Sequence, residues 1–253
     1  FGLFFETSFG NKFVVNPTLA VTSGDGRNSF GDDSRDSDKG GVKFGSRINI
    51  LPFGDFSIGN RLSTVDLMHE ENPKVQIGVA YSKNMGASNQ VGDGHADFIL
   101  YDNSGDELFP DYSQLFLDLN LKYKGFSLVL EYADAFASGL NQIYTDPNAF
   151  NLLIPQQISE YLVVGDSQGI QFGYFTKNGI SIDLIYENLN PEFDSFESSL
   201  LRKSTNMGVG VSKYLAGNNL KIQASLFKTG YENLNNLDDD EFMSGSFLVQ
   251  IAF

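Results

Sequence analysis

Ser246-Phe247-Leu248-Val249-Gln250-Ile251-Ala252-Phe253, the last eight residues of the sequence, alternate between two faces of an extended strand. Successive side chains of a strand point to opposite faces. One face therefore carries only large apolar side chains, namely Phe247, Val249, Ile251 and Phe253. An apolar face that continues to a final Phe is typical of a strand whose outer side meets lipid. The first question about the fold is therefore whether such faces contact lipid or a protein core.

The composition predicts an all-β protein. The chain has 253 residues, with 23 Phe, 11 Tyr, 26 Gly and no Trp. Aromatic residues favour strands, and few stretches of the sequence have a helical apolar pattern. No stretch approaches the roughly 20 apolar residues of a membrane-spanning helix. A transmembrane barrel has no such stretch either, because its lipid-facing and lumen-facing residues alternate.

Charge and cysteine content narrow the function classes. The formal net charge is −15 at pH 7. Phosphate binding needs clustered Lys and Arg, so we expect no nucleic-acid partner. The chain has no Cys, which excludes disulfides and thiolate metal sites. The first residue is Phe1, and we expect that a leader segment has been removed if the protein is secreted.

Alternation of apolar and polar side chains predicts about eleven strands. The clearest candidates are 75–81, 115–123, 126–132, 180–187 and 221–228, and weaker or terminal candidates are 2–9, 12–22, 41–51, 169–176, 205–214 and 246–253. In three strands the apolar row ends in Tyr, at Tyr81, Tyr123 and Tyr186. We interpret these Tyr and Phe253 as a girdle at a lipid–water interface. The alternative is a soluble sandwich with Tyr at the rim of its core.

Connection lengths favour the barrel over the sandwich. Short turns are predicted at 10–11, 124–125, 178–179 and 216–218, and both residues of Asn178-Gly179 are expected to have positive φ. Long polar connections fall between them, at 23–40, 84–112, 137–162, 190–204 and 232–241. Short and long connections therefore alternate, as periplasmic turns and extracellular loops do in outer-membrane barrels. The sequence thus predicts one antiparallel transmembrane β-barrel domain over residues 1–253, with the long connections outside the cell.

Two features depart from a simple barrel. Residues 53–72 form a connection on the short-turn side, yet it is about twenty residues long. The pattern gives no physical account of it, and a short extra strand and a periplasmic lobe are both open as alternatives. The strand count is also odd, whereas bacterial single-chain barrels have even counts and periplasmic termini. Either the pattern miscounts the strands by one or N-terminal strands precede this sequence, and we expect the latter.

Several short motifs resemble a porin family. They are 24–28, 51–54, Pro73 to Tyr81, 122–127, 131–134, 212–215, Gly217 and 220–223. Together they resemble phosphate-selective porins of the O and P type, in the version found in Bacteroidota. The resemblance implies a sixteen-stranded, trimeric porin in the outer membrane of a Gram-negative bacterium. This sequence would be its C-terminal two-thirds, in contact with outer-membrane lipid and lipopolysaccharide.

Strand parity predicts the residues that line the pore. They are Lys43, Arg47, Lys74, Asp118, Lys122, Glu131, Asp183, Glu187 and Lys221. Their charges nearly balance, whereas the resemblance implies Lys and Arg ladders for phosphate. The predicted function is passive diffusion of small hydrophilic solutes or ions, with selectivity set by pore width and these charges. The alternative is a plugged or accessory barrel subunit of a larger envelope complex.

Other chemistry has weaker support in the sequence. Hard cations such as Ca²⁺ prefer carboxylate oxygens, and a candidate cluster holds Asp32, Asp33, Asp36 and Asp38. The EF-hand spacing fails, because the twelfth position from Asp32 is Lys43. We interpret this cluster, and a second one at 238–241, as solvated loop tips, with Ca²⁺ bridging to lipopolysaccharide as the alternative. Asp93 and His95 could activate water as a pair, but their flanking glycines favour a plain loop, and we expect no enzyme.

Overall fold

The computed structural model describes residues 2–23, 42–90, 92, 98–193, 201–216, 219–232 and 240–251, and within them the chain is all-β. Eleven strands form one antiparallel sheet in the order β1-β2-β3-β4-β5-β6-β9-β10-β11-β12-β13. Their bounds are β1 Gly2–Glu6, β2 Val14–Thr22, β3 Lys43–Leu51, β4 Lys74–Asn84, β5 Asp111–Tyr123, β6 Phe126–Ser138, β9 Gly165–Phe175, β10 Ile180–Pro191, β11 Ser204–Tyr214, β12 Leu220–Tyr231 and β13 Asp240–Ile251. The prediction of an all-β fold is confirmed.

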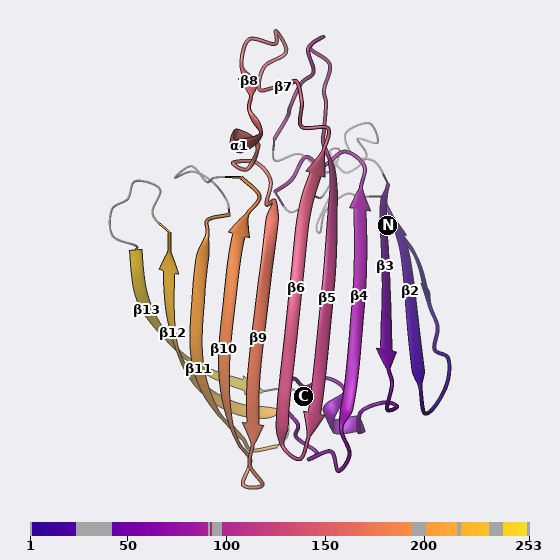
Figure 1. Cartoon of the computed structure of the whole chain (residues 1–253), viewed down its shortest axis with the longest axis vertical. Helices are drawn as coiled ribbons and strands as arrows, with labels where there is room; N and C mark the ends of the chain where they lie inside the picture. Colours follow the sequence, from indigo (N-terminus) through magenta and orange to yellow (C-terminus); the bar gives the residue numbers. More distant parts are fainter. Residues whose placement is uncertain are drawn as a thin grey trace.

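The sheet is strongly curved, and the lower ends of β11 to β13 bend across the view in Figure 1. It is not closed: within the described ranges β1 pairs only with β2, and β13 pairs only with β12. No helix in the described part of the chain is long and apolar enough to cross a bilayer. Each strand of this sheet pairs with the next one along the chain, except that β7 and β8 lie between β6 and β9 and form a separate two-stranded sheet.

Two short turns differ in their backbone geometry. Lys124 and Gly125, between β5 and β6, both have positive φ, of 49° and 89°. This matches the two-residue hairpin that the twist of the flanking strands favours. The same expectation for Asn178-Gly179 was wrong, since only Gly179 has positive φ (75°). There the N–H of Gly179 donates to the carbonyl of Thr176 (3.0 Å), so the turn begins one residue earlier and needs a single left-handed residue.

The long connections on either side of β5 and β6 fold into one compact upper lobe, which we define as residues 98–110 and 139–164. It contains β7 (Ile143–Tyr144), β8 (Leu152–Leu153) and α1 (Pro155–Ile158), and stands above the sheet in Figure 1. Its core side chains are fully buried: Leu100, Ile143, Ile158, Leu162 and Val164. The sequence predicted these stretches as polar loops and gave no sign of this core.

The connection between β3 and β4 forms a second, lower lobe, which we define as residues 52–73. It contains the 3-10 turn η2 (Ile58–Asn60) and lies at the short-turn end of the sheet in Figure 1. Its side chains Phe56, Val65, Asp66 and Asn60 are buried. Of the two alternatives for this segment, the structure shows a packed lobe and no extra strand within residues 52–73.

Gly125→Ala should destabilise the β5–β6 turn. A Cβ at this position would lie 2.6 Å from the carbonyl oxygen of Phe175, and the φ of +89° disfavours any L side chain. We expect the free energy of unfolding to fall by about 2 kcal/mol, measured as a lower urea midpoint. Gly210→Ala is the matched control, because its Cβ would meet nothing closer than 3.9 Å. Equal midpoints for the two variants would contradict this view of the turn.

Candidate functional site

All nine residues predicted to line a pore lie on one face of the sheet. Residues directly opposite each other in an antiparallel pair share a face. One such row runs from Asp118 through Glu131 and Gly169 to Glu187. Parity then assigns the remaining members to the same side: Lys43, Arg47, Lys74, Lys122, Asp183 and Lys221. We call this side the polar face.

On the opposite side, which we call the apolar face, the described residues form no second layer of protein. Leu184 is 53% exposed and Leu117 is 41% exposed. The row of Leu115, Leu119 and Leu121 beside Leu117 is also partly exposed. Exposed apolar surface of this extent marks contact with a partner or a membrane, because a soluble sheet would bury it.

The apolar residues form a band that crosses the strands obliquely. One row of paired residues serves as a reference line: Val15, Ile50, Ile77, Leu119, Leu130, Ile170, Tyr186, Met207, Lys228 and Met243. In β2 the apolar side chains extend from this row toward the long-connection end, up to Val21. In β10 they extend the other way, from Tyr186 down to Ile180.

The shift of the band is regular. Its midpoint lies three residues above the reference row in β2, level with it in β5, and three residues below it in β10. The band therefore moves by about one residue per strand. With about 3.3 Å per residue and about 4.8 Å between strands, this corresponds to strands tilted by about 35° from the normal to the band. Strands of closed barrels tilt by a similar angle.

The predicted girdle residues that the structure describes lie at the edges of this band. Tyr81 and Tyr186 end the apolar rows of β4 and β10 at the long-connection side, and Tyr123 ends that of β5 at the short-turn side. Tyr132 and Tyr174 occupy corresponding positions in β6 and β9, and the sequence analysis did not assign them to the girdle. Phe253 lies outside the described residues.

At mid-height the polar face carries more unpaired acid than base. Arg47 forms an ion pair with Asp118 (Nη2 to Oδ2, 2.7 Å). Glu187 accepts a hydrogen bond from Asn206 (2.9 Å), and within the described part of the chain neither Glu187 nor Glu131 is ion-paired. These four charged residues line a hollow of about 510 Å³. Any ion that follows this face therefore passes carboxylates whose charge is not neutralised.

Lys122 shares this face but has a structural role. It is fully buried, and its Nζ donates to the backbone carbonyls of Asn60 (2.6 Å) and Ser63 in the lower lobe. The ammonium group also lies 4.6 Å from the centre of the Phe56 ring. A solute at the polar face therefore does not meet this cation.

Two buried carboxylates complete the attachment of the lower lobe. Asp66 accepts a hydrogen bond from the N–H of Gly125 (2.7 Å), in the β5–β6 turn. The side-chain amide of Asn60 donates to both Asp66 (2.7 Å) and Glu70 (2.9 Å). Glu70 also accepts bonds from the N–H (2.7 Å) and hydroxyl (3.0 Å) of Ser57. The lobe is thus held to the sheet by a connected polar network with Lys122 as its cation.

The lower lobe stands over the polar face and not outside the sheet. A hollow of about 810 Å³ separates its Leu62 and Met68 from Lys221 of β12 and Gln250 of β13. At the other end, the upper lobe packs on Tyr112 of the same face, whose hydroxyl donates to the carbonyl of Val163 (2.5 Å). Both ends of the polar face are therefore partly covered by packed lobes.

The remaining candidates add no site. Among the described residues, no group of three or more His, Asp or Glu side chains is arranged to hold a metal ion. The Asp32, Asp33, Asp36 and Asp38 cluster lies outside the described residues, as do Asp93 and His95. Of the second acidic cluster, only the Glu241 side chain is described; it is ion-paired with Lys228 (2.8 Å).

Comparisons with family models, curated proteins and solved structures gave no match to this chain. The resemblance to phosphate-selective porins therefore stays a prediction. The inference of function depends on the two faces of the sheet and on the lobes.

Lys122→Met should release the lower lobe. It leaves Asp66 and Glu70 buried without their cation, and such a loss typically costs about 3 kcal/mol. We expect trypsin to cleave after Arg61 at least ten times faster than in the wild type, measured by gel densitometry. Lys221→Met, on the same face but without bonds to the lobe backbone, is the control. Unchanged cleavage in Lys122→Met would show that the network does not hold the lobe.

Proposed function

We propose that this chain forms the wall of an outer-membrane β-barrel through which small hydrophilic solutes and ions diffuse passively. The observation that carries the proposal is the oblique apolar band. A bilayer contacts a barrel over a belt of constant height, and tilted strands enter that belt at shifted positions. The shift of about one residue per strand is what such tilted strands require.

The dimensions of the band support a membrane environment. Along β5, the apolar row from Leu115 to Tyr123 spans about 26 Å at about 3.3 Å per residue, which a tilt of about 35° reduces to a height of about 22 Å. This is close to the roughly 25 Å apolar belt of outer-membrane barrels, and the shorter row of β10, from Ile180 to Tyr186, spans about 16 Å in height. Tyr side chains at both edges of the band suit the interface between acyl chains and water.

Closure of the barrel requires further strands. Unpaired backbone groups are too unfavourable in hydrocarbon for an open sheet edge to persist there. The free edges of β1 and β13 would therefore pair with strands beyond those described, which agrees with the sixteen strands that the porin resemblance implies.

We propose a mild preference for cations in this channel. Glu131 and Glu187 are not ion-paired within the described structure, whereas Arg47 is paired and Lys122 is buried. A wall of this sign attracts cations and repels phosphate. Phosphate is therefore a poor candidate for the preferred solute, despite the resemblance.

A plugged structural barrel is the second candidate function, and the two lobes favour it. Both lobes lie over the polar face, and lobes of this kind could close the lumen at each end. Conductance in planar bilayers distinguishes the candidates, because a plugged barrel gives no openings above the leak.

Leu184→Arg tests the membrane environment. In a soluble sheet, replacing this half-exposed Leu by Arg would change stability by less than about 0.5 kcal/mol. In a bilayer we expect a loss of about 2–4 kcal/mol, measured by urea unfolding of the protein folded into lipid vesicles. Gln223→Arg, on the polar face, is the matched control and should be nearly neutral. Equal effects of the two substitutions would contradict a lipid-facing band.

Glu131→Gln combined with Glu187→Gln tests the channel. We expect single-channel openings in the wild type, with K⁺ more permeant than Cl⁻, and a reversal potential in a KCl gradient that moves toward zero in the double variant. Glu160→Gln, in the upper lobe, removes the same kind of charge away from this row and should leave the reversal potential unchanged. Silent bilayers with correctly folded protein would favour the plugged barrel.

A further inference from the structure

The hollow at mid-height of the polar face, which we call the mid-height hollow, has two carboxylates in excess. It has a volume of about 510 Å³, and the charged residues that line it are Arg47, Asp118, Glu131 and Glu187. Arg47 and Asp118 form an ion pair (2.7 Å) and neutralise each other. Glu131 and Glu187 are exposed and contribute the two remaining negative charges. A solute with two positive charges therefore balances the charge of the hollow.

A glycine separates these two carboxylates. Glu131 of β6 and Glu187 of β10 are both cross-strand neighbours of Gly169, which lies on β9 between them. Their Cα atoms are therefore two strand spacings apart, about 10 Å. A Cβ on Gly169 would lie 3.8 Å from Oε2 of Glu131, whereas Glu187 is turned toward β11, where its Oε2 accepts a hydrogen bond from Asn206 (2.9 Å). The two acids thus offer separate binding points, with no side chain between them.

Apolar side chains form the next row of the same face, toward the long-connection end. Phe116, Ala133, Ser167 and Leu189 are successive cross-strand neighbours in β5, β6, β9 and β10, and all four line the mid-height hollow. Phe116 is 38% exposed and Leu189 is 36% exposed. Such side chains add nothing to the binding of an inorganic ion, but burial of methylene groups against them is favourable. The hollow therefore combines two separate acids with an apolar wall.

We propose that the mid-height hollow binds linear aliphatic diamines, in which a short hydrocarbon chain joins two ammonium groups. One ammonium binds the Glu131 carboxylate and the other binds the Glu187 carboxylate, while the chain lies over Gly169 against Ala133 and Leu189. Both carboxylates are exposed, so binding is weak and reversible, as passage through a pore requires. This inference rests on the proposed channel and names the class of solute that binds within it.

Block of the single-channel K⁺ current in planar bilayers tests the site on the wild-type protein. The probes are 1,5-diaminopentane, pentylammonium, which lacks one charge, and Mg²⁺, which lacks the chain. We expect the diamine to halve the current at a concentration about tenfold lower than either of the others, because only the diamine makes two charge-assisted hydrogen-bonded contacts and also buries a chain. Equal half-blocking concentrations of the diamine and Mg²⁺ would overturn the proposal, since the hollow would then recognise charge alone. Equality of the diamine with pentylammonium would overturn it as well.

Gly169→Val connects this preference to the space between the two acids. The variant keeps both carboxylates but puts a side chain in the path of the hydrocarbon chain, and its Cβ meets nothing closer than 3.8 Å. We expect the half-blocking concentration of the diamine to rise about tenfold, to that of Mg²⁺. Glu131→Gln combined with Glu187→Gln should remove the preference too. Unchanged diamine block in either variant would overturn the site.

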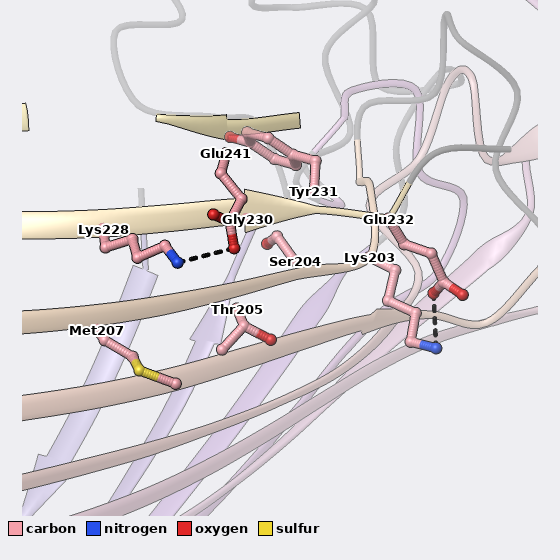
Figure 2. A pocket seen from close by; sticks show the side chains of 9 residues that line it. All are labelled: Lys203, Ser204, Thr205, Met207, Lys228, Gly230, Tyr231, Glu232 and Glu241. Carbon is pink, nitrogen blue, oxygen red and sulfur yellow. Dashed lines mark ion pairs between the residues drawn. The ribbon is translucent and has the colours of Figure 1, made fainter. Parts of the chain in front are cut away.

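Glu232→Gln combined with Glu241→Gln is the matched control for the double loss of carboxylates. These acids are ion-paired with Lys203 (2.6 Å) and Lys228 (2.8 Å), as the dashed lines of Figure 2 mark, and they line a separate hollow of β11 to β13. We expect the diamine preference of the wild type to persist in this control. A cation-selective channel without the diamine preference would overturn the site and leave the proposed channel intact, whereas bilayers without openings would overturn both.

Discussion

The constraint on which the rest of the structure depends is the fixed offset between hydrogen-bonded rows and the apolar band. Backbone pairing sets one direction across the sheet, and the exposed apolar side chains follow another, shifted by about one residue per strand. A core packed against a second sheet has no reason to shift its apolar rows continuously in one sense. A belt of solvent-excluding lipid around tilted strands has such a reason. The same offset decides which residues of β11–β13 lie above the band.

The buried network around Lys122 explains how a twenty-residue connection can stay folded over a polar wall. A buried cation is unfavourable unless its charge and all its donors are satisfied. Here two backbone carbonyls accept two of its three N–H groups, the Phe56 ring lies beside the ammonium, and Asp66 and Glu70 supply the compensating charge nearby. Those carboxylates in turn bind the β5–β6 turn and Ser57. The network is local in space but joins residues about sixty positions apart, so it fixes the lobe against one strand end.

The alternation of apolar and polar residues was sufficient to predict the strands and which residues share a face of the sheet. This is because successive side chains of a strand point to opposite faces. Alternation did not predict the two lobes, whose contacts join residues that are far apart in the sequence. The lower lobe depends on Lys122, which alternation could only assign to the polar face. The upper lobe core combines Leu100 with Ile143 and Ile158, which are short apolar insertions in stretches that read as polar. The Asn178-Gly179 turn failed for a local reason, since Thr176 accepts the closing hydrogen bond and shifts the turn.

The number of charged residues on the polar face is a poor guide to the electrostatic field beside that face. By sequence the nine polar-face residues nearly balance, with five cations and four carboxylates. In the structure Arg47 is neutralised by Asp118 and Lys122 is engaged by the lower lobe. Lys74 donates to the carbonyl of Phe53 at the lobe (2.7 Å), near the short-turn end. Lys122 and Lys74 thus attach the lower lobe and Arg47 is ion-paired, while Glu131 and Glu187 lie at mid-height beside a hollow. At mid-height the carboxylates of Glu131 and Glu187 therefore have no ion-pair partner in the described part of the chain, whereas Arg47 has one.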